Sequence, residues 1–253
     1  MWYDKTVCLV FPAYNEAENI EQAIGSFLSV HIGGKRVVDR VIVIDNNSRD
    51  ETRERAIRSG AVVIHETAQG YGHAIQRGLR EADGDLILLA EPDGTFVAED
   101  LIKLCAYSKD FDLVCGTRTT QELIWNEANM GWFLRVGNVL VAKLMEVLYG
   151  TCSLSDCGCT FRLIHTYAAK RILPDLHVGG SHLLPNMIIA ARFHSLSMIE
   201  IPLNYRGRIG QSKITGTWTG TLKTGLAMIW LIFRSWPGFL LSRNRSPLHG
   251  TDS

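Results

Sequence analysis

The sequence lacks an excess of either charge, because its 26 Lys and Arg residues balance its 26 Asp and Glu residues. A chain of zero net charge has no overall field that would gather nucleic acid, so we expect no nucleic-acid partner. The first residues also lack the basic stretch followed by an apolar stretch that marks a secretory signal. We therefore expect no signal peptide and a location on the cytoplasmic side of the membrane.

Cysteines are few, and their spacing is not that of a small disulfide-rich domain. Three of them lie close together in the sequence, but they lack the paired C-x-x-C spacing of a zinc site. The sequence therefore predicts reduced, mostly buried thiols at Cys8, Cys105, Cys115, Cys152, Cys157 and Cys159.

The sequence also lacks a glycine-rich phosphate loop after its first predicted strand. There is no Walker motif, and the run Gly70-Tyr-Gly-His-Ala-Ile75 lacks the third glycine of a dinucleotide fingerprint and follows the third strand. A nucleotide bound by this chain is therefore held by other means.

What is present is an alternation of short apolar runs with amphipathic segments. Ser48 and Glu51 have the spacing of a capping box, which predicts that a helix begins there and continues to about residue 59. Strands that alternate with helices of this length indicate βαβ units and a mostly parallel sheet, and 253 residues are enough for one large α/β domain. We expect strands at 6–11, 40–45, 61–65 and 85–90, and further helices at 20–28, 73–82, 131–149 and 183–193.

Polar side chains follow these strands where each one ends. The central strand, at 85–90, must stop at Pro92, which cannot extend a ladder, and at Gly94, which permits a tight bend. Acidic residues at a carboxyl strand end suit a hard divalent cation that also takes phosphate oxygens. The alternative is a plain surface turn, because Pro-Asp-Gly is common turn chemistry. The clusters are Tyr14, Asn15 and Glu16, then Asp45 and Asn46, then Glu91 and Asp93.

Six ordered motifs carry a resemblance to a known family over about residues 5–235. Their order and spacing resemble family 2 glycosyltransferases with the GT-A fold, and the last three look like the branch that makes polyprenyl-phosphate (dolichyl-phosphate) mannose and glucose. The motifs are Pro12-Ala-Tyr-Asn-Glu16, Ile44-Asp-Asn-Asn-Ser-Arg-Asp50, Gly70-Tyr-Gly-His-Ala74, Cys115-Gly-Thr-Arg118, Asp156-Cys-Gly-Cys-Thr-Phe-Arg162 and Arg208-Ile-Gly-Gln-Ser-Lys213.

The resemblance implies a GT-A (Rossmann-like) α/β domain at 1–220, with a mostly parallel sheet flanked by helices. It implies inverting transfer of a hexose from GDP-mannose or a UDP-sugar to a polyprenyl phosphate, assisted by Mg²⁺ or Mn²⁺.

The resemblance also implies which residues bind the metal and the nucleotide sugar. Glu91 and Asp93 are the implied metal ligands. The family usually has Asp at the position of Glu91 and often has Gln at the position of Thr95. The implied nucleotide-sugar residues are Pro12, Tyr14, Glu16, Asp45, Asn46, Gly70 and Asp93.

Arginines recur in the otherwise apolar second half, and several converging arginine forks would form a phosphate clamp. The alternative is that they are solvated or paired. The motifs place Arg118 and Arg208 first, and the Gly- and Ser-bearing residues 207–220 read as a loop able to close over substrate. The candidate acceptor-phosphate residues are Arg118, Arg135, Arg208, Ser212 and Lys213; Arg162 and Arg206 complete the arginine set.

A general base is expected in family members that use a hydroxyl acceptor, but the helix predicted at 183–193 offers Asn186 instead of a carboxylate. A phosphate acceptor is already an oxyanion at neutral pH and needs orientation more than a base. The missing carboxylate therefore favours a lipid phosphate, with Asp156 left as a candidate base. The predicted catalytic set is Asp93, Asp156, Arg118 and Arg208. The alternatives are a soluble or glycan hydroxyl acceptor and a non-catalytic nucleotide-sugar-binding membrane protein.

The C-terminal part, 221–253, is predicted to be an amphipathic interfacial helix with a flexible tail. Residues 222–241 are apolar and rich in Trp, but Arg234 and Pro237 interrupt them, so spanning is not expected. Trp beside basic residues suits a helix lying in the headgroup plane, which implies peripheral attachment to a membrane surface. The alternative is a core helix or a contact in a homo-oligomer.

Overall fold

The computed structural model describes residues 2–125, 132–207 and 218–243. A seven-stranded sheet forms its centre, in the order β5-β4-β1-β6-β8-β7-β9. All neighbouring pairs are parallel except those of β8, which runs antiparallel to β6 and to β7. The mostly parallel sheet predicted from the sequence is therefore confirmed. The strands are β1 (Val7–Ala13), β4 (Arg40–Asp45), β5 (Val62–His65), β6 (Leu86–Leu89), β7 (Leu113–Thr117), β8 (Arg162–His165) and β9 (Met198–Pro202).

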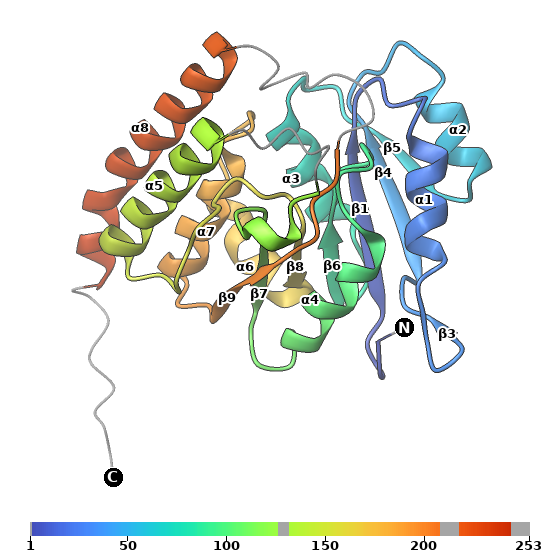
Figure 1. Ribbon diagram of the computed structural model, residues 1–253, viewed down its shortest axis with the longest axis horizontal. Helices are drawn as coiled ribbons and strands as arrows, with labels where there is room; N and C mark the ends of the chain where they lie inside the picture. Colours follow the sequence, from blue (N-terminus) through green and yellow to red (C-terminus); the bar gives the residue numbers. More distant parts are fainter. Residues whose placement is uncertain (1, 126–131, 208–217, 244–253) are drawn as a thin grey trace.

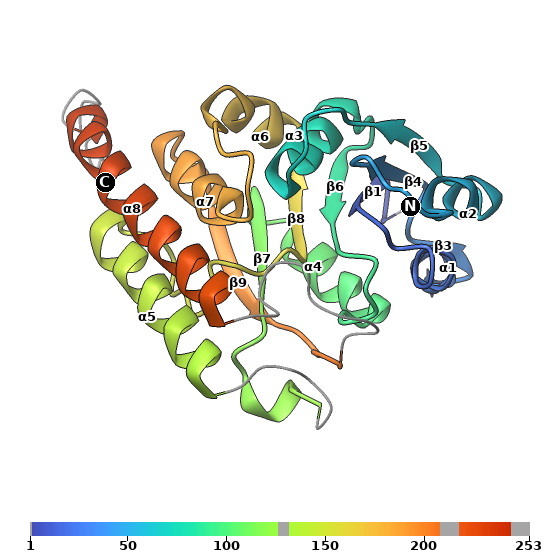
Figure 2. The same ribbon diagram turned by 90° about the horizontal axis from the view of Figure 1, so that it is seen from above.

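Helices cover both faces of this sheet (Figure 1; Figure 2). One face packs against α1, α2 and α4, and the other packs against α3 and α5 to α8. Smaller elements are the hairpin of β2 (His31–Ile32) and β3 (Lys35–Arg36) and the 3-10 turns η1 (Ala98–Asp100), η2 (Gln121–Leu123) and η3 (Leu173–Asp175). The helices are α1 (Ile20–Leu28), α2 (Thr52–Arg58), α3 (Tyr71–Glu81), α4 (Leu101–Tyr107), α5 (Trp132–Tyr149), α6 (Thr166–Ile172), α7 (Leu183–Phe193) and α8 (Trp218–Arg243).

The central strands are apolar along their whole length because both faces are covered. In β1, Cys8 and Val10 enter one apolar cluster, whereas Val7, Leu9 and Phe11 enter the other. This alternation follows from the two-residue period of a strand. All six cysteines are free thiols and five of them are buried, as predicted.

The first turn of α2 differs from the prediction. The helix begins at Thr52 rather than near Ser48, and the backbone N–H of Thr52 donates to Asp50 (3.1 Å). The capping box is wrong because its two members are used elsewhere. The hydroxyl of Ser48 accepts a hydrogen bond from the N–H of Asn15 (3.0 Å), and Glu51 pairs with Arg55 (2.8 Å).

Helix α8 spans the predicted domain boundary at 220 and 221 and lies beside α5 in both views (Figure 1; Figure 2). The phenol of Tyr149 in α5 donates to the carbonyl of Ile232 (2.6 Å), and the indole of Trp236 donates to the carbonyl of Leu148 (3.2 Å). Among the described residues, Lys223–Leu241 is the one stretch long and apolar enough to cross a bilayer, a test that core helices of soluble proteins also pass.

Candidate active site at the carboxyl edge of the sheet

Strands β1, β4, β6 and β7 run in one direction, so the segments that follow them meet at one edge of the sheet. The register places Asp45, at the end of β4, beside Ala13 at the end of β1, and the N–H of Asn46 donates to the carbonyl of Ala13 (2.9 Å). Glu91 and Asp93 follow β6, and Arg118 follows β7. The fold therefore brings three predicted clusters to a common edge.

The loops after β1 and β4 interlock. Asn15 has a positive φ of 53°, and its side chain accepts a hydrogen bond from the N–H of Arg49 (2.8 Å). The N–H of Glu16 donates to the hydroxyl of Thr52 (2.7 Å). These contacts bring the loop after β1 close to Asp45, at the end of β4. The predicted residues on this side are Pro12, near the end of β1, and Tyr14 and Glu16 in the loop. Tyr14 is 36% exposed.

Asp45 is almost enclosed, with 4% exposure. One carboxylate oxygen accepts the N–H of Ser48 (3.0 Å), and the other lies 3.6 Å from Nδ1 of His65 at the end of β5. This carboxylate therefore has a fixed orientation at the junction of two loops. That geometry suits an acceptor for ribose or base donors.

Asn46 and Gly70 have partners within the chain. The amide nitrogen of Asn46 donates to the carbonyls of Glu66 (3.0 Å) and Ala68 (2.8 Å), and its oxygen accepts the N–H of Gly70 (2.7 Å). Gly70 has a φ of 147°, and a Cβ there would lie 2.4 Å from the carbonyl oxygen of Gly179. The Asn46 side chain thus shapes the loop at 66–70, and the glycine is required by the chain's own backbone. Their predicted contact with a nucleotide sugar stays a prediction.

The first turn of α3 is capped by the chain itself. The carbonyl of Gly179 accepts the N–H of Gly72 (2.8 Å), and a Cβ at Gly72 would lie 2.2 Å from the carbonyl oxygen of Val178. A main-chain carbonyl therefore occupies the place that a phosphate takes in a glycine-rich nucleotide loop. This arrangement agrees with the absence of such a motif from the sequence.

The acidic turn after β6 is internally braced. Asp93 is 3% exposed, and one of its oxygens accepts both the N–H (3.0 Å) and the hydroxyl (2.6 Å) of Thr95. One oxygen of Glu91 accepts the hydroxyls of Tyr71 (3.0 Å) and Thr160 (2.6 Å). Burial, followed by the charge of Glu91, raises the pKa of Tyr71 well above its usual value, so its phenol remains a donor.

The described residues contain no cluster of three or more His, Cys, Asp or Glu side chains suited to a metal ion. Glu91 and Asp93 stand two positions apart on a turn at the strand end, and both carry hard oxygen donors. This pair fits Mg²⁺ or Mn²⁺ in the manner of sites that fill their remaining positions with phosphate oxygens and water.

Arg118 is held by Asp156 in a bidentate ion pair. Nε and Nη2 of Arg118 donate to the two carboxylate oxygens (2.7 and 3.0 Å), and the backbone N–H of Arg118 donates as well (3.2 Å). Asp156 has no exposed surface. Burial acts to raise the pKa of Asp156, but the charge and hydrogen bonds of Arg118 outweigh it and the pKa lies below its usual value. A buried carboxylate with a lowered pKa, already paired, is poorly suited to the predicted alternative of a general base.

The other predicted arginines separate into different environments. Arg162 is fully buried and donates to the carbonyls of Cys157 (2.6 Å), Cys159 (2.7 Å) and Leu184 (2.7 Å), so a role for it in a phosphate clamp is wrong. The guanidinium of Arg206 lies 4.4 Å from the ring centre of Trp125. Arg135 is half-buried in α5. Arg208, Ser212 and Lys213 lie outside the described residues.

Asn186 is 7% exposed in α7 and ties the preceding segment to that helix. Its oxygen accepts the N–H of His177 (3.2 Å), and its nitrogen donates to the carbonyl of Asp175 (3.3 Å). The asparagine therefore has a packing function at the position where the sequence analysis looked for a base.

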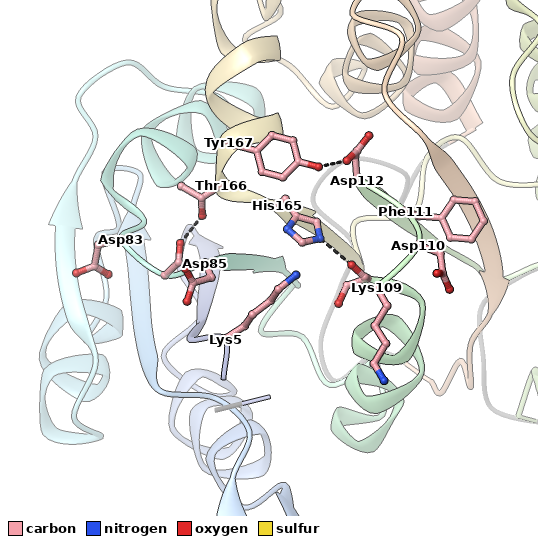
Figure 3. A pocket seen from close by; sticks show the side chains of 12 residues that line it. Lys5, Asp83, Asp85, Lys109, Asp110, Phe111, Asp112, His165, Thr166 and Tyr167 are labelled. Carbon is pink, nitrogen blue, oxygen red and sulfur yellow. Dashed lines mark hydrogen bonds between the residues drawn. The ribbon is translucent and has the colours of Figure 1, made fainter. Parts of the chain in front are cut away.

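The structure has one cavity beside the acidic turn and another far from it. One of about 630 Å³ lies on the α1 side of the acidic turn and is lined in part by Asn19, Gly94, Trp125 and Arg206. The other, of about 670 Å³, lies at the opposite edge of the sheet, where Lys5 precedes β1 (Figure 3). The cavity beside Lys5 is therefore remote from the carboxylates and from Arg118.

Comparison with known families decides the classification. The model of glycosyl transferase family 2 matches residues 8–173, which is more than half of the chain. The chain belongs to glycosyl transferase family 2. The matched range contains each of the three clusters of the carboxyl edge and the Arg118–Asp156 pair.

Relatives within the family include the low-salt glycan biosynthesis hexosyltransferase Agl6 of Haloferax volcanii. It is 28% identical over 239 residues, which cover 94% of this chain but 55% of that protein, so the chain spans about half of its length. The dolichyl-phosphate hexose transferase of the same organism is 29% identical over 213 residues, covering 82% of this chain and 86% of that protein.

Among solved structures, glucosyl-3-phosphoglycerate synthase of Mycobacterium tuberculosis, in complex with Mn²⁺, UDP-glucose and phosphoglyceric acid, has a TM-score of 0.66. It is 21% identical, and the match covers 98% of this chain and 83% of that one. At this identity the likeness shows a shared fold.

Some residues that contact the predicted site residues were not predicted from the sequence. Tyr71 and Thr160 lie inside quoted motifs, but only the fold shows that their hydroxyls meet at Glu91. Ser155 and Glu200 have no motif of their own, and their contacts are made between segments far apart in the sequence. No local signal in the sequence could have identified them.

Proposed function

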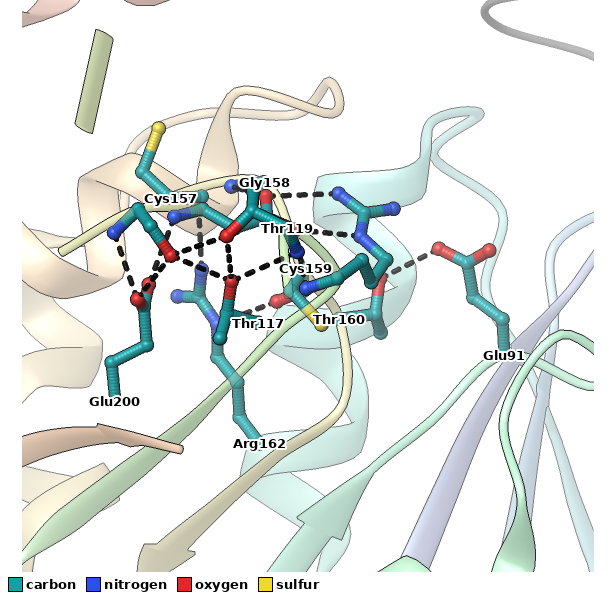
Figure 4. Close-up of polar contacts among 12 residues, drawn as sticks. Glu91, Thr117, Thr119, Cys157, Gly158, Cys159, Thr160, Arg162 and Glu200 are labelled. Carbon is teal, nitrogen blue, oxygen red and sulfur yellow. Dashed lines mark hydrogen bonds and ion pairs between the residues drawn. The ribbon is translucent and has the colours of Figure 1, made fainter. Parts of the chain in front are cut away.

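We propose that this family 2 enzyme transfers a hexose, with inversion, from a UDP- or GDP-linked sugar to a polyprenyl or dolichyl phosphate at the surface of a membrane. One observation carries the proposal. The stretch 156–160 holds Arg118 at its first residue through Asp156 and Glu91 at its last residue through Thr160 (Figure 4). One short segment therefore contacts both a guanidinium suited to a phosphate and a carboxylate suited to a metal.

The donor half of the site comprises Pro12, Tyr14, Glu16 and Asp45 for the base and ribose, with Asn46 and Gly70 shaping the adjoining loop. Asp93 and Glu91 would hold Mg²⁺ or Mn²⁺. When bound, such a cation would supply positive charge that offsets the charge of the departing nucleoside diphosphate. The structural neighbour that contains Mn²⁺ and UDP-glucose supports this part of the proposal.

In the acceptor half, Arg118 binds the phosphate and orients one of its oxygens toward the anomeric carbon. The new bond joins that oxygen to the anomeric carbon as the bond from this carbon to the diphosphate breaks. The nucleophile carries its negative charge beforehand, so no side chain has to remove a proton. This agrees with Asn186 at the position where a base was sought and with an Asp156 that is committed to Arg118. The relative named dolichyl-phosphate hexose transferase also supports a lipid phosphate as the acceptor.

Attachment to the membrane is assigned to the outer faces of α5 and α8. Both helices expose large apolar side chains, with Leu140 and Val147 on α5 and Leu226, Trp230 and Phe233 on α8. The guanidinium of Arg234 lies 4.8 Å from the ring centre of Trp230, which combines a cation with an interfacial aromatic. This surface would place a peripheral enzyme beside a lipid-linked acceptor.

The test is a transfer assay with a panel of UDP- and GDP-sugars and three acceptors in parallel: a short-chain polyprenyl phosphate, the matching polyprenol and 3-phosphoglycerate. We expect transfer to the polyprenyl phosphate to be fastest and to require Mg²⁺ or Mn²⁺. Arg118→Lys keeps the charge but loses the fork, so it should lower kcat/KM for the phosphate acceptor about tenfold without changing the KM of the donor. Faster transfer to polyprenol or to 3-phosphoglycerate would overturn the proposed acceptor.

A further inference from the structure

The carboxylate of Glu200, in β9, accepts hydrogen bonds from Ser155 and Asp156, and Asp156 is the residue that pairs with Arg118. One oxygen of Glu200 accepts both the N–H (2.8 Å) and the hydroxyl (2.6 Å) of Ser155, and the other accepts the N–H of Asp156 (2.9 Å). The register pairs Glu200 with Cys115 of β7, the strand from whose end Arg118 emerges. Glu200 therefore lies on the strand next to the one that leads to Arg118.

The contacts continue from Ser155 to the hydroxyls of Thr117 and Thr119, which are labelled in Figure 4 together with Glu200. The hydroxyl of Ser155 lies 2.7 Å from that of Thr117 and accepts a hydrogen bond from the hydroxyl of Thr119 (2.6 Å). These threonines stand on either side of Arg118 in the sequence. Through Ser155, Glu200 thus fixes the flanks of the arginine, and through the Asp156 main chain it fixes the carboxylate that binds the guanidinium.

We propose that Glu200 is a positioning residue for the guanidinium of Arg118, acting through Ser155 and Asp156 and touching no substrate itself. The inference rests on the proposed function only in naming the acceptor phosphate as the group that Arg118 binds. A half-buried carboxylate is costly to retain unless its oxygens are satisfied, and here three donors satisfy them. An apolar side chain would fill the same space without ordering the two amide groups.

A purely structural brace is the competing explanation, and Glu146 provides a matched control. Its carboxylate accepts the N–H of Leu154 (3.1 Å), one residue before Ser155, but it also pairs with Lys143 (2.6 Å) and has no recorded link to Arg118. Glu146→Gln therefore perturbs the same segment from its other side. Glu200→Gln removes one acceptor and points an amide nitrogen at a backbone N–H.

The kinetic test is a double-variant cycle with Glu200→Gln, Arg118→Lys and their combination. Glu200→Gln should lower kcat/KM for the acceptor about tenfold, while the KM of the donor stays within twofold. In the Arg118→Lys background the same change should cost less than threefold, because the group that it positions is already impaired. Additive losses, or an equal loss in Glu146→Gln, would overturn the inference.

A second measurement separates this inference from the proposed acceptor. In ¹⁵N-labelled protein the Arg118 Nε–H, assigned by its absence from Arg118→Lys, should give a slowly exchanging signal because it donates to Asp156. The signal should persist in Glu146→Gln and broaden or exchange faster in Glu200→Gln at matched thermal stability. An unchanged signal in Glu200→Gln contradicts the positioning role. If the signal behaves as expected while polyprenyl phosphate is not a substrate, the acceptor proposal alone has failed.

Discussion

At the scale of single residues, the proposed chemistry depends on the hydrogen-bond and ion-pair partners of three carboxylates. Asp156 is paired with Arg118, Glu91 takes two hydroxyls, and Asp93 is braced by Thr95. Residue types and spacing in the sequence located Glu91 and Asp93, since acid-x-acid after an apolar run is a local pattern, whereas Asp156 was located within a motif of the family resemblance. Their different partners could not be predicted in this way, because Tyr71 and Thr160 approach Glu91 from segments 20 and 69 positions away.

Asp93 provides a prediction at this scale. Asp93→Asn should reduce transfer at least about a hundredfold, because a neutral amide neither holds the divalent cation nor balances its charge. Its oxygen still accepts from Thr95, so circular dichroism and the unfolding midpoint should change little. Binding of Mn²⁺ with UDP, followed by the electron paramagnetic resonance of free Mn²⁺, should be lost in parallel. Asp110→Asn, in the remote cavity, is the control, and Mn²⁺ binding that survives in Asp93→Asn would contradict the assignment.

At the scale of elements, local periodicity was a reliable guide to helices. The predicted range 20–28 coincides with α1, because apolar side chains spaced for one face define a helix locally. The predicted range 183–193 coincides with α7, although this helix is buried on all sides from 183 to 191 and has no such face. Local periodicity did not predict the start of α2 or the direction of β8. Helix α2 begins later than predicted because the hydroxyl of Ser48 accepts a hydrogen bond from Asn15 instead of capping the helix. The direction of β8 depends on which strands become its neighbours in the sheet, and these are distant in the sequence.

Helix α8 provides a prediction at this scale. The double variant Trp230→Ser/Phe233→Ser should weaken binding to vesicles containing anionic lipid about tenfold, because two exposed apolar side chains, 59% and 52% accessible, no longer enter the interface. Both positions face away from the packed side of the helix, so thermal stability should be retained. Co-sedimentation measures the effect, and Val62→Ser, an exposed apolar residue on β5, is the control. If wild-type protein stays in the supernatant and the double variant abolishes a dimer, α8 is an oligomer contact.

At the scale of the whole molecule, several carboxylates tie distant parts of the chain together. Asp85, before β6, accepts both the N–H and the hydroxyl of Thr6, before β1 (2.8 Å each). These hydrogen bonds, the backbone one foremost, lower the pKa of Asp85. The folded protein therefore binds fewer protons at this site than the unfolded chain does, and the resulting stability is present above the ordinary carboxyl pKa and lost as the pH falls below about 4.

This linkage predicts how Asp85→Asn differs from the wild type. The variant should be less stable at pH 7, and the difference in free energy of unfolding should narrow as the pH falls from about 5 to 3, because the wild type loses the contribution that the variant already lacks. Urea unfolding at a series of pH values measures both quantities. Thr6→Val removes one of the two donors and should show the same trend with a smaller amplitude. A difference that stays constant or widens in acid would show that Asp85 acts by packing alone.

The reversed direction of β8 has a consequence for how this molecule can change. The segment that leads into β8 reaches the reactive edge from before a strand, whereas the other site segments leave strands there. We expect a change in the length of the chain just before β8 to alter the positions of the proposed site residues. An insertion just after β8 would lie at the opposite edge of the sheet, beside Lys5, and should not alter those positions. The two ends of this four-residue strand should therefore differ in how strongly a change of chain length affects transfer activity.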